Sequence, residues 1–372
     1  MHARGMLEAL KRRIGAENIA VSGLNNTVNN YKHSLEKFKK QFNRYLTFIR
    51  MTRRYLLSFK NAKKLHALMV DQGALPDVIL ARSVLYDYTP LLLAKKFGCK
   101  LIIEHNTPLV YECCDLNKSD FRINVRSFER NILSKADGIY VVSEHLRKML
   151  ESAYGFGNKT IAIANGYMDE LFVSDTVIKE AIREKIRREF NPGNKWIVVF
   201  IGSLQVWHGI ENLIKAAEIL SNVNDIEFWV LGDGEKRNDV KKYSESHMNL
   251  KWFGNLPMEN MRDFLYGSDL GVMPYNRIKH FYFSPLKMYD MIGAGLPFLG
   301  LKVGQIEELC SKELNQDFML NDTTGCLLAN SIKSLHENTE RYATMKVLVS
   351  KASGNHTWDV RAERLVTWMS TL

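Results

Sequence analysis

Residues 196–209, WIVVFIGSLQVWHG, decide the fold of the back half of this chain. The β-branched and aromatic run up to Ile201 predicts a buried strand, and Ile210 to Leu220 have the apolar spacing of a helix. A strand, a glycine turn and a helix start form an anion site, because backbone amides can approach a phosphate there and the helix start supplies unpaired N–H groups. Ser203 and His208 would add side-chain donors.

Glycines are the first sign of where a ligand would bind. Gly202 and Gly209 bracket the turn after this strand, and further glycines follow the next two predicted strands, at Gly232, Gly234 and Gly254. In open parallel α/β sheets, ligands bind at the edge where the strands end. The alternative is that these glycines only turn the chain.

Residues 281–297, FYFSPLKMYDMIGAGLP, carry the densest set of candidate site residues. Ser284 and Pro285 suit a helix N-cap and first position, so we expect a helix to begin there and to continue through Leu286. Lys287 would lie in the first turn, where a cation is unfavourable unless an anion offsets it, and this predicts a bound phosphate. Asp290, one turn later, could accept hydrogen bonds from sugar hydroxyls. A solvated amphipathic helix with a proline cap is the alternative.

Strand-like and helix-like segments alternate along the whole chain, which predicts an α/β fold with parallel sheets. The expected strands are residues 18–22, 77–81, 100–104, 138–142, 196–201, 226–231, 250–253, 270–273 and 297–300. We place an N-terminal Rossmann-like domain at residues 1–170 and a second at 171–357, with 358–372 packing back on the first. A Rossmann-like domain should open with a strand, and the first strand is missing here, since Met1 leads into a helix.

Composition sets the broad class of protein. A length of 372 residues, with 46% hydrophobic and 25% charged residues, is typical of a globular protein of about two domains. Apolar runs are too short for a membrane span, and the chain opens without a secretory leader, so we expect a cytoplasmic protein. The five cysteines lack metal-knuckle spacing, and no Asp-X-Asp triplet occurs, so no metal is expected.

The net charge of +10 is concentrated in residues 32–64, which hold eleven Lys or Arg and one acid, Glu36. Aromatic and aliphatic residues at helical spacings interleave with these cations, which predicts one or two basic amphipathic helices. Such helices suit an anionic membrane surface, and peripheral attachment to the inner face of the cell membrane is our preferred hypothesis. A solvated helix face is the alternative. Base-reading motifs are absent, so no nucleic-acid partner is expected.

In these motifs the chain resembles the retaining glycosyltransferases of family 4, which have the GT-B fold of two facing Rossmann-like domains. The resemblance rests on Gly202-Ser203 with Trp207-His208-Gly209, on Ser284-Pro285-Leu286-Lys287 through Gly295, on Asn321 to Gly325, and on Asn165-Gly166. It implies a hexosyltransferase of polysaccharide biosynthesis, which moves a sugar from a nucleotide-diphosphate sugar to a glycan or lipid-linked acceptor with retention and without a metal.

The resemblance also assigns roles to single residues. Ser203 and His208 occupy positions where many relatives place the Arg and Lys that hold the donor diphosphate, and Lys287 would restore that charge. Asp290 matches the family's ribose-binding glutamate. Tyr282 falls about where another glutamate contacts the transferred sugar.

In the first domain, relatives place a histidine or an asparagine beside the reacting sugar, which implies His105 or Asn106 here. Asn106 fits the register better. Neighbouring strand residues point to opposite faces, so both cannot enter the site if the strand stays regular. Two other readings remain open, a nucleotide-sugar epimerase of the same fold and a non-catalytic sugar-nucleotide-binding protein.

Overall fold

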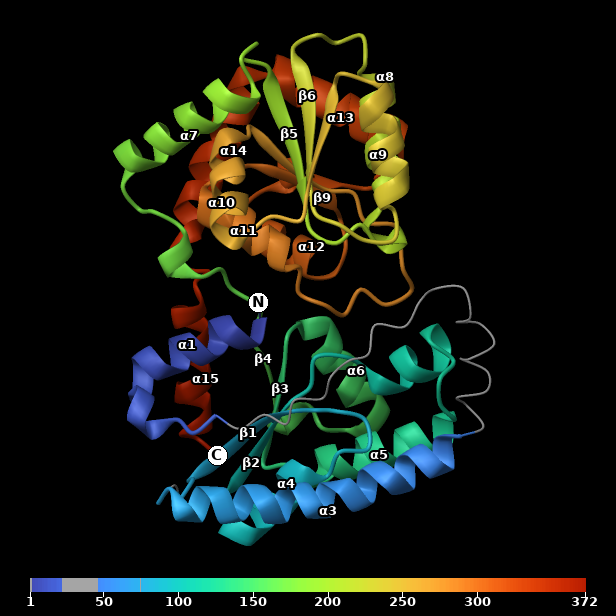
Figure 1. The fold of residues 1–372 in the computed structure, drawn as a ribbon, viewed down its shortest axis with the longest axis vertical. Coiled ribbons are helices and arrows are strands. Elements are labelled where there is room, and N and C mark those ends of the chain that lie inside the picture. The colour runs from blue at the N-terminus through green and yellow to red at the C-terminus, as the bar shows by residue number, and fades with distance from the viewer. Residues whose placement is uncertain (1, 22–45, 74) are drawn as a thin grey trace. The chain divides into compact units, whose positions relative to one another are not determined.

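A computed structural model describes residues 2–21, 46–73 and 75–372 (Figure 1). The chain forms two compact units. The N-terminal unit comprises Leu10–Ala164 with Glu363–Leu372, and the C-terminal unit comprises Asn165–Ala362 with the residues up to Ala9. The chain therefore passes from one unit to the other after Ala9, after Ala164 and after Ala362.

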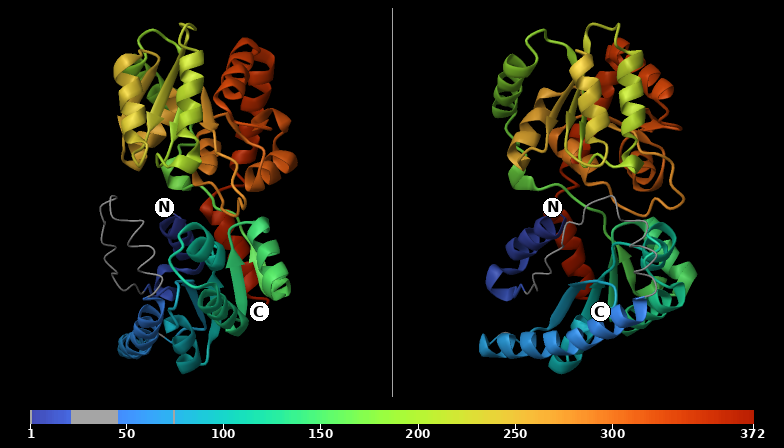
Figure 2. Two further views of the ribbon diagram at one scale, coloured as in Figure 1. Left: turned by 90° about the vertical axis from the view of Figure 1, so that its right-hand side faces the viewer. Right: turned by 45° about the vertical axis from the view of Figure 1, so that its right-hand side comes forward.

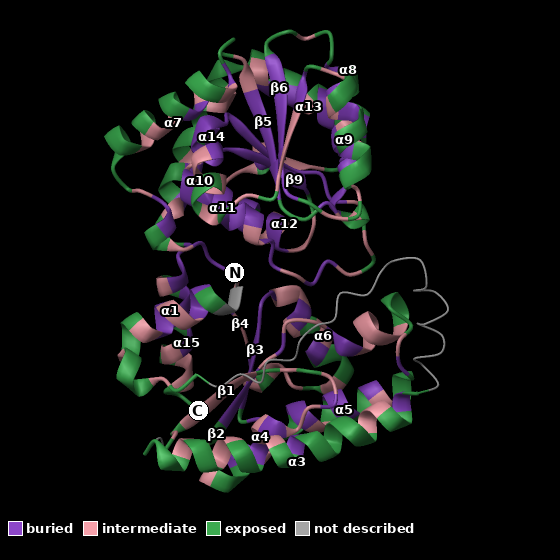
Figure 3. Ribbon diagram, in the orientation of Figure 1, coloured by how far each residue is buried: buried purple, intermediate pink, exposed green. Residues whose placement is uncertain are grey.

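The N-terminal unit is built on a parallel sheet in the order β1-β2-β3-β4. Its strands are β1 (Val78–Arg82), β2 (Lys100–Glu104), β3 (Gly138–Val141) and β4 (Thr160–Ala162). Its helices include α3 (Thr47–Asp71), α4 (Thr89–Phe97), α5 (Arg122–Lys135) and α6 (Glu144–Tyr154). The middle strands are apolar and buried, as Figure 3 shows, so the core of this unit lies between the sheet and its helices.

The strand predicted at residues 18–22 is wrong over its described part. Helix α1 (His2–Ile14) ends at Gly15, and Ala16–Asn18 forms a short 3₁₀ turn in place of an extended chain. The Asn18 side chain donates to the carbonyl of Ile14, and its backbone N–H donates to Gly15. Residues 19–21 pair with no described strand, and Ser22 lies outside the described residues. The local turn chemistry of asparagine outweighed the β propensity of the residues that follow.

The C-terminal unit holds a six-stranded parallel sheet in the order β10-β9-β8-β5-β6-β7. Its strands are β5 (Trp196–Ile201), β6 (Ile226–Leu231), β7 (Leu250–Gly254), β8 (Leu270–Met273), β9 (Phe298–Leu301) and β10 (Met319–Leu320). Its helices include α7 (Thr176–Phe190), α8 (Ile210–Ile219), α9 (Arg237–Ser246), α10 (Met258–Gly267), α11 (Leu286–Ala294), α12 (Gly304–Glu313), α13 (Gly325–Glu337) and α14 (Thr339–Ser353). Helices cover both faces of this sheet, as Figure 2 shows, so the predicted α/β fold is confirmed.

The strand order of this sheet determines where a ligand can bind. From the central strand β5 the chain moves outward through β6 and β7, and it then returns to the other side of β5 to form β8. The order reverses between β5 and β8, and α/β sheets bind ligands beyond the strand ends at such a reversal. The loop after β5 and the loop after β8 therefore start side by side.

Helix α15 (Trp358–Met369) contributes to both units. Within the N-terminal unit, Glu363 accepts a 2.6 Å hydrogen bond from Arg13, and the Trp368 ring lies where a side chain at Gly138 would stand. Glycine at the start of β3 thus leaves room for the end of the chain.

Candidate functional site

The loops after β5 and β8 are bound to each other. The backbone N–H of Asn276 donates to the carbonyl of Trp207 at 3.2 Å, and its side-chain amide donates to Val206 at 2.9 Å. The rings of His208 and Tyr275 pack edge to face, with centroids 5.3 Å apart. The predicted neighbours Gly202, Ser203, His208 and Gly209 are therefore brought together with the segment that leads to Lys287.

Three predicted glycines allow the loop backbones to approach closely. Gly202 has φ 118° and donates its N–H to Leu231. A Cβ at Gly232, where φ is 141°, would lie 1.9 Å from the carbonyl oxygen of Gly202. A Cβ at Gly234 would lie 2.7 Å from the backbone nitrogen of Leu204. Only glycine fits these positions, so the ends of β5 and β6 form one continuous backbone surface.

Lys287 is the central side chain of this region. It is only 8% exposed, and its ammonium finds no hydrogen-bond partner among the described residues. Nζ lies 4.1 Å from the centroid of Phe200 and 5.2 Å from that of Tyr275. A Cβ at Gly202 would lie 3.2 Å from the same atom, so the cation lies beside the glycine turn. Burial lowers the pKa of Lys287 to about 7, because the charged form is poorly solvated there.

Two helix starts face the same strand edge. Helix α8 begins after Gly209, which has φ 71°, and α11 begins at Leu286 with Pro285 as its N-cap. Neither N-cap residue, Gly209 or Pro285, has a side chain that accepts a hydrogen bond from the first backbone N–H groups of its helix. Their first backbone N–H groups are thus left for a ligand or for solvent.

The predicted cap at Ser284 is wrong. Its hydroxyl accepts a hydrogen bond from the backbone N–H of Asn165 at 3.0 Å, and its carbonyl accepts from the Asn165 side chain at 2.7 Å. Pro285 is therefore the N-cap itself, and Leu286 is the first helical residue. Ser284 joins the helix start to the segment that opens the C-terminal unit.

His208 is buried and electrically neutral near pH 7. Burial and the neighbouring Lys287 lower its pKa to about 3. Its Nδ1 lies against the carbonyl oxygen of Ser203, so this nitrogen must carry the proton, and Nε2 keeps a lone pair. A neutral ring of this tautomer offers no donor at Nε2, which leaves Lys287 as the cation of the site. Ser203 is exposed, and its hydroxyl is 3.4 Å from Nδ1.

Asp290 and Tyr282 are also buried in the C-terminal unit. Asp290 lies one turn after Lys287 on α11, and burial raises the pKa of its carboxyl to about 7. Lys287 and Asp290 therefore both have a pKa near 7, because burial destabilises the charged form of each. Such perturbed groups mark candidate functional sites.

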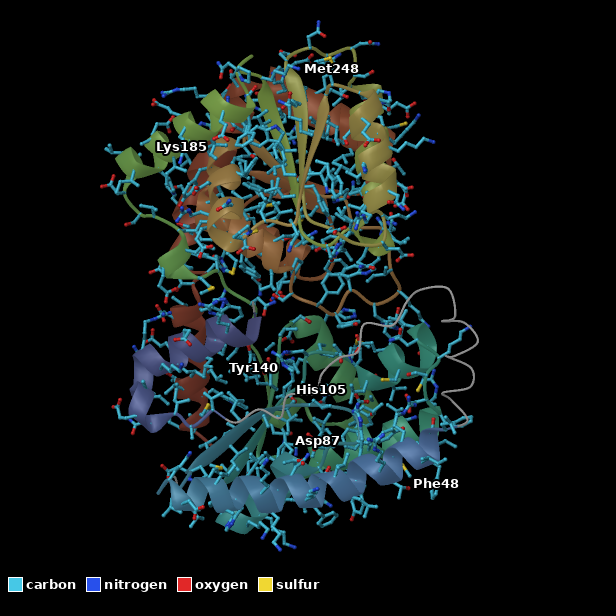
Figure 4. The ribbon with its side chains drawn as sticks, viewed as in Figure 1. Phe48, Asp87, His105, Tyr140, Lys185 and Met248 are labelled. Atoms are coloured by element: carbon cyan, nitrogen blue, oxygen red, sulfur yellow. The ribbon has the colours of Figure 1, made fainter. Side chains whose placement is uncertain are left out.

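His105 lies at the end of β2 in the N-terminal unit and has no exposed surface (Figure 4). Its Nε2 lies 3.0 Å from a carboxylate oxygen of Glu129, which also accepts from the N–H of Leu109 and from the hydroxyl of Tyr154. Burial raises the pKa of Glu129, but the hydrogen bonds from His105, Tyr154 and Leu109 outweigh it and hold the pKa below its ordinary value. This network gives His105 a structural role, and its catalytic role stays a prediction.

Asn106 is half-buried and contacts other neighbours. Its Nδ2 donates to a Glu104 oxygen at 2.6 Å, and Glu104 also pairs with Arg82 at 2.9 Å. The Asn106 side-chain oxygen has no partner in the described structure. Nδ1 of His105 likewise has no partner there, so the two residues differ in exposure and in neighbours but each keeps one unpartnered polar atom.

One candidate was missed by the sequence reasoning. Gln305 is the second residue of α12, is buried, and has a side-chain oxygen without a partner among the described residues. Because β9 neighbours β8, the start of α12 lies at the same sheet edge as that of α11. The strand–glycine–helix pattern at Gly304 repeats the pattern after β5 and could have revealed it.

No cluster of three or more His, Cys, Asp or Glu side chains suited to a metal ion occurs in the described part of the chain. Likewise, none of the described helices has the length and apolar character that crossing a bilayer requires.

Two family models match the chain, one in each half. Residues 6–170 match "Glycosyltransferase Family 4", and residues 195–338 match "Glycosyl transferases group 1". The chain is 25% identical over 254 residues to a putative teichuronic acid biosynthesis glycosyltransferase, TuaH, of Bacillus subtilis (strain 168), which covers 64% of this chain and 61% of that protein. It is 28% identical over 116 residues to the alpha-D-kanosaminyltransferase of Streptomyces kanamyceticus, covering 31% and 29%. The chain thus spans less than two thirds of either relative.

Solved structures share the fold. A glycosyltransferase from Rickettsia africae has a TM-score of 0.68 and 14% identity, covering 99% of this chain and 94% of that one. Anabaena Alr3699/HepE in complex with UDP has a TM-score of 0.66 and 18% identity, covering 83% and 82%. The predicted GT-B fold is confirmed, and each half of the chain matches a glycosyltransferase family model.

Proposed function

We propose that this protein transfers a sugar from a nucleotide-diphosphate sugar to a glycan or lipid-linked acceptor. The observation that carries the proposal is Lys287, a buried ammonium without a hydrogen-bond partner beside a glycine turn and two uncapped helix starts. A buried cation of this kind is costly unless an anion accompanies it. Helix starts are suited to bind phosphate oxygens, so a diphosphate matches both features.

In the proposed reaction, the bond between the anomeric carbon and the β-phosphate oxygen breaks as the acceptor oxygen bonds to that carbon. The acceptor's proton passes to the leaving β-phosphate, so no protein nucleophile is needed. Lys287 and the amides after Gly202 and Pro285 stabilise the charge that develops on the diphosphate. We propose retention of configuration, and we propose that this cationic environment replaces a divalent metal, so a chelator should leave the rate unchanged.

Uridine diphosphate is the nucleotide we propose first. Anabaena Alr3699/HepE, which has a similar fold, was solved in complex with UDP and with UDP-glucose. Asp290 would hold the ribose hydroxyls, one helix turn from Lys287. In the N-terminal unit, Asn106 is the group we place beside the reacting sugar, because it is half-buried, whereas His105 is fully buried, and its side-chain oxygen has no partner among the described residues.

Lys287→Ala tests the proposal. The variant should retain its fold and lose most transfer from UDP-glucose, as measured by release of UDP in the presence of acceptor. Lys179→Ala is a matched control, because Lys179 is also a partly buried lysine of the C-terminal unit, with its Nζ over the ring of Tyr266. Wild-type activity in Lys287→Ala would contradict the proposal.

Two further assays separate the rival functions. An epimerase would convert UDP-glucose in the absence of any acceptor, which mass-neutral isomerisation in an NMR spectrum would reveal. A non-catalytic binder would bind the nucleotide sugar and neither transfer nor hydrolyse it. Release of UDP that depends on acceptor distinguishes a transferase from both.

A membrane surface is the partner we propose for α3. Phe48, Ile49 and Leu56 are 68%, 63% and 62% exposed and lie on one side of this helix. With Thr52, Arg53, Leu57 and Lys60 they line an open groove of about 530 Å³, which we call the α3 groove. Figure 4 labels Phe48 at the start of the helix. Exposed apolar side chains that gather on one face of a helix are candidates for contact with a partner or a membrane.

The other side of α3 is fixed to the N-terminal unit. Arg50 pairs with Asp120 at 2.6 Å, Arg54 donates to the carbonyl of Leu85, and Ser58 bonds to Asp87. The α3 groove thus faces away from these contacts. The helix carries six Lys or Arg residues and one acid, Asp71, so its charge complements an anionic leaflet. Of the predicted basic stretch, residues 32–45 lie outside the described residues.

Sedimentation with vesicles tests this partner. The double variant Phe48→Gln with Leu56→Gln should lose binding to phosphatidylcholine vesicles that contain phosphatidylserine. Ile123→Gln and Met248→Gln remove exposed apolar side chains elsewhere and should bind as the wild type does. Equal partitioning of all variants, or no dependence on phosphatidylserine, would count against the membrane.

A further inference from the structure

Trp207 is distinctive in the C-terminal unit. It is 39% exposed, and it is the only Phe, Tyr or Trp among the exposed residues of that unit that the structure describes. Every other Phe, Tyr or Trp that the structure describes in that unit is buried or half-buried. Solvent exposure of an indole costs free energy that folding normally recovers by burial, so an exposed tryptophan at a defined place indicates a ligand surface.

The position of Trp207 connects it to the proposed diphosphate site. Its ring stacks on Tyr275 with centroids 5.9 Å apart and an interplanar angle of 15°. On the same Tyr275 ring lies the ammonium of Lys287, 5.2 Å from the centroid. One aromatic ring therefore separates the proposed phosphate-binding cation from the exposed indole, which is the length scale of a sugar linked to a phosphate.

The indole is also held rigidly. Phe283 packs edge to face against it at 5.2 Å, and Phe281 packs on Phe283 at 4.0 Å. Asn276 donates its backbone N–H to the carbonyl of Trp207 and its side-chain amide to the carbonyl of Val206. The Asn212 side chain donates to the side-chain oxygen of Asn276 at 3.1 Å. A rigid aromatic surface loses little conformational entropy when a ligand stacks on it.

We propose that Trp207, supported by Tyr275 and Phe283, is a stacking surface for a pyranose ring, and that this ring is the sugar of the donor. The inference rests on the proposed donor site. One face of a pyranose is lined by C–H bonds, which carry partial positive charge and pack on the negative face of an indole. The segment Phe281-Tyr282-Phe283 carries no carboxylate, so contacts to the sugar in this region are aromatic rather than ionic.

Binding measurements can distinguish the donor sugar from two other ligands that could stack on Trp207. The nucleobase could stack on the indole instead, but Asp290, our ribose ligand, lies one turn further along α11, whereas Trp207 lies across Tyr275 on the preceding loops. A pyranose of the acceptor is the other source of the same chemistry. Measuring UDP, UDP-glucose and acceptor separately distinguishes the three.

The experiment compares binding of UDP and UDP-glucose by calorimetry in wild type, Trp207→Ala and Trp207→Phe. Trp207→Ala should weaken UDP-glucose binding about five- to tenfold, which is the scale of a single aromatic contact, and should leave UDP binding unchanged. Trp207→Phe should recover most of the loss. Trp196→Phe, at the opposite end of β5, is the matched control and should bind both ligands as the wild type does.

Each outcome decides a different point. Equal weakening of UDP and UDP-glucose would overturn the proposal in favour of base stacking. An unchanged affinity for both nucleotides, with a raised KM for acceptor, would assign the pyranose to the acceptor, and no change in any measurement would overturn the stacking surface while leaving the donor site intact. Failure of the wild type to bind either nucleotide would instead refute the proposed function itself.

Discussion

At the scale of single residues, Lys287 combines burial, the absence of a hydrogen-bond partner among the described residues, and a pKa lowered to about 7. A diphosphate would favour its charged form and raise that pKa in the complex. Below pH 7 the free lysine is already protonated, so binding takes up no proton there. Above pH 7 the free lysine is neutral, and binding must protonate it.

We therefore predict that UDP-glucose binding weakens as the pH rises from 7 to 9, by up to about tenfold per unit. UDP-glucose is the right probe, because it lacks the terminal phosphate that titrates near pH 6 in UDP. Calorimetry across this range checks the prediction. Lys287→Met should bind weakly and without this slope, and Asp290→Asn removes the other group whose pKa is near 7. A wild-type affinity that stays flat would contradict it.

The sequence located Lys287 because a lysine in the first turn of a helix opposes the dipole, and that conflict is visible without coordinates. It placed the helix cap wrongly at Ser284, and the donor-binding role of His208 stays a prediction. The hydroxyl of Ser284 is bound by Asn165, 119 positions away, and the His208 ring is turned toward the carbonyl of Ser203. For Ser284, the local pattern allowed a helix cap, and a partner far along the chain bound the hydroxyl instead.

At the scale of elements, the glycine turns make a sharp test possible. Gly232 follows β6 and Gly254 is the last residue of β7, and both have positive φ, 141° and 68°. A Cβ at Gly232 would meet the backbone oxygen of Gly202, whereas nothing lies within 4 Å of one at Gly254.

Gly232→Ala should therefore destabilise the protein by about 3 kcal/mol or more, because a backbone atom cannot give way. Gly254→Ala should cost only the left-handed conformation, about 1 kcal/mol. Denaturant unfolding of the two variants measures the difference. Similar losses would show that φ alone, and not the closeness of the two loops, requires glycine.

Strand predictions succeeded where the apolar run was long and failed where it was short. The run from Trp196 to Ile201 was placed to the residue, because five of its six residues are buried and the pattern is continuous. Strands β4 and β10 were missed, since they have three and two residues and form only because a neighbouring strand offers hydrogen bonds. The β propensity of a short segment does not show whether a neighbouring strand will pair with it.

At the scale of the whole molecule, two compact units predict two unfolding events. All proposed donor-binding groups lie in the C-terminal unit. UDP-glucose at about 100 times its Kd should stabilise that unit by about 2.7 kcal/mol and raise its transition temperature, with little effect on the other. Scanning calorimetry with and without ligand checks this. A single transition that shifts as a whole would mean that the units unfold together.

The two α/β halves were foreseeable because each repeats the alternation of strand and helix. The places where the chain changes unit were less so. Gly5 belongs to the C-terminal unit, and its Cβ position is occupied by the indole of Trp358. Such pairings between the two ends of a chain leave no local signal in the sequence.

The borders of the six-stranded sheet limit self-association. On one side the last strand, β10, has only two residues, and on the other the pairing of β7 with β6 slips between Val230 and Leu231. A short or irregular border offers a foreign strand few consecutive N–H and C=O groups to pair with. Concentrated samples of this protein should therefore resist the edge-on stacking by which exposed sheets begin to form fibrils.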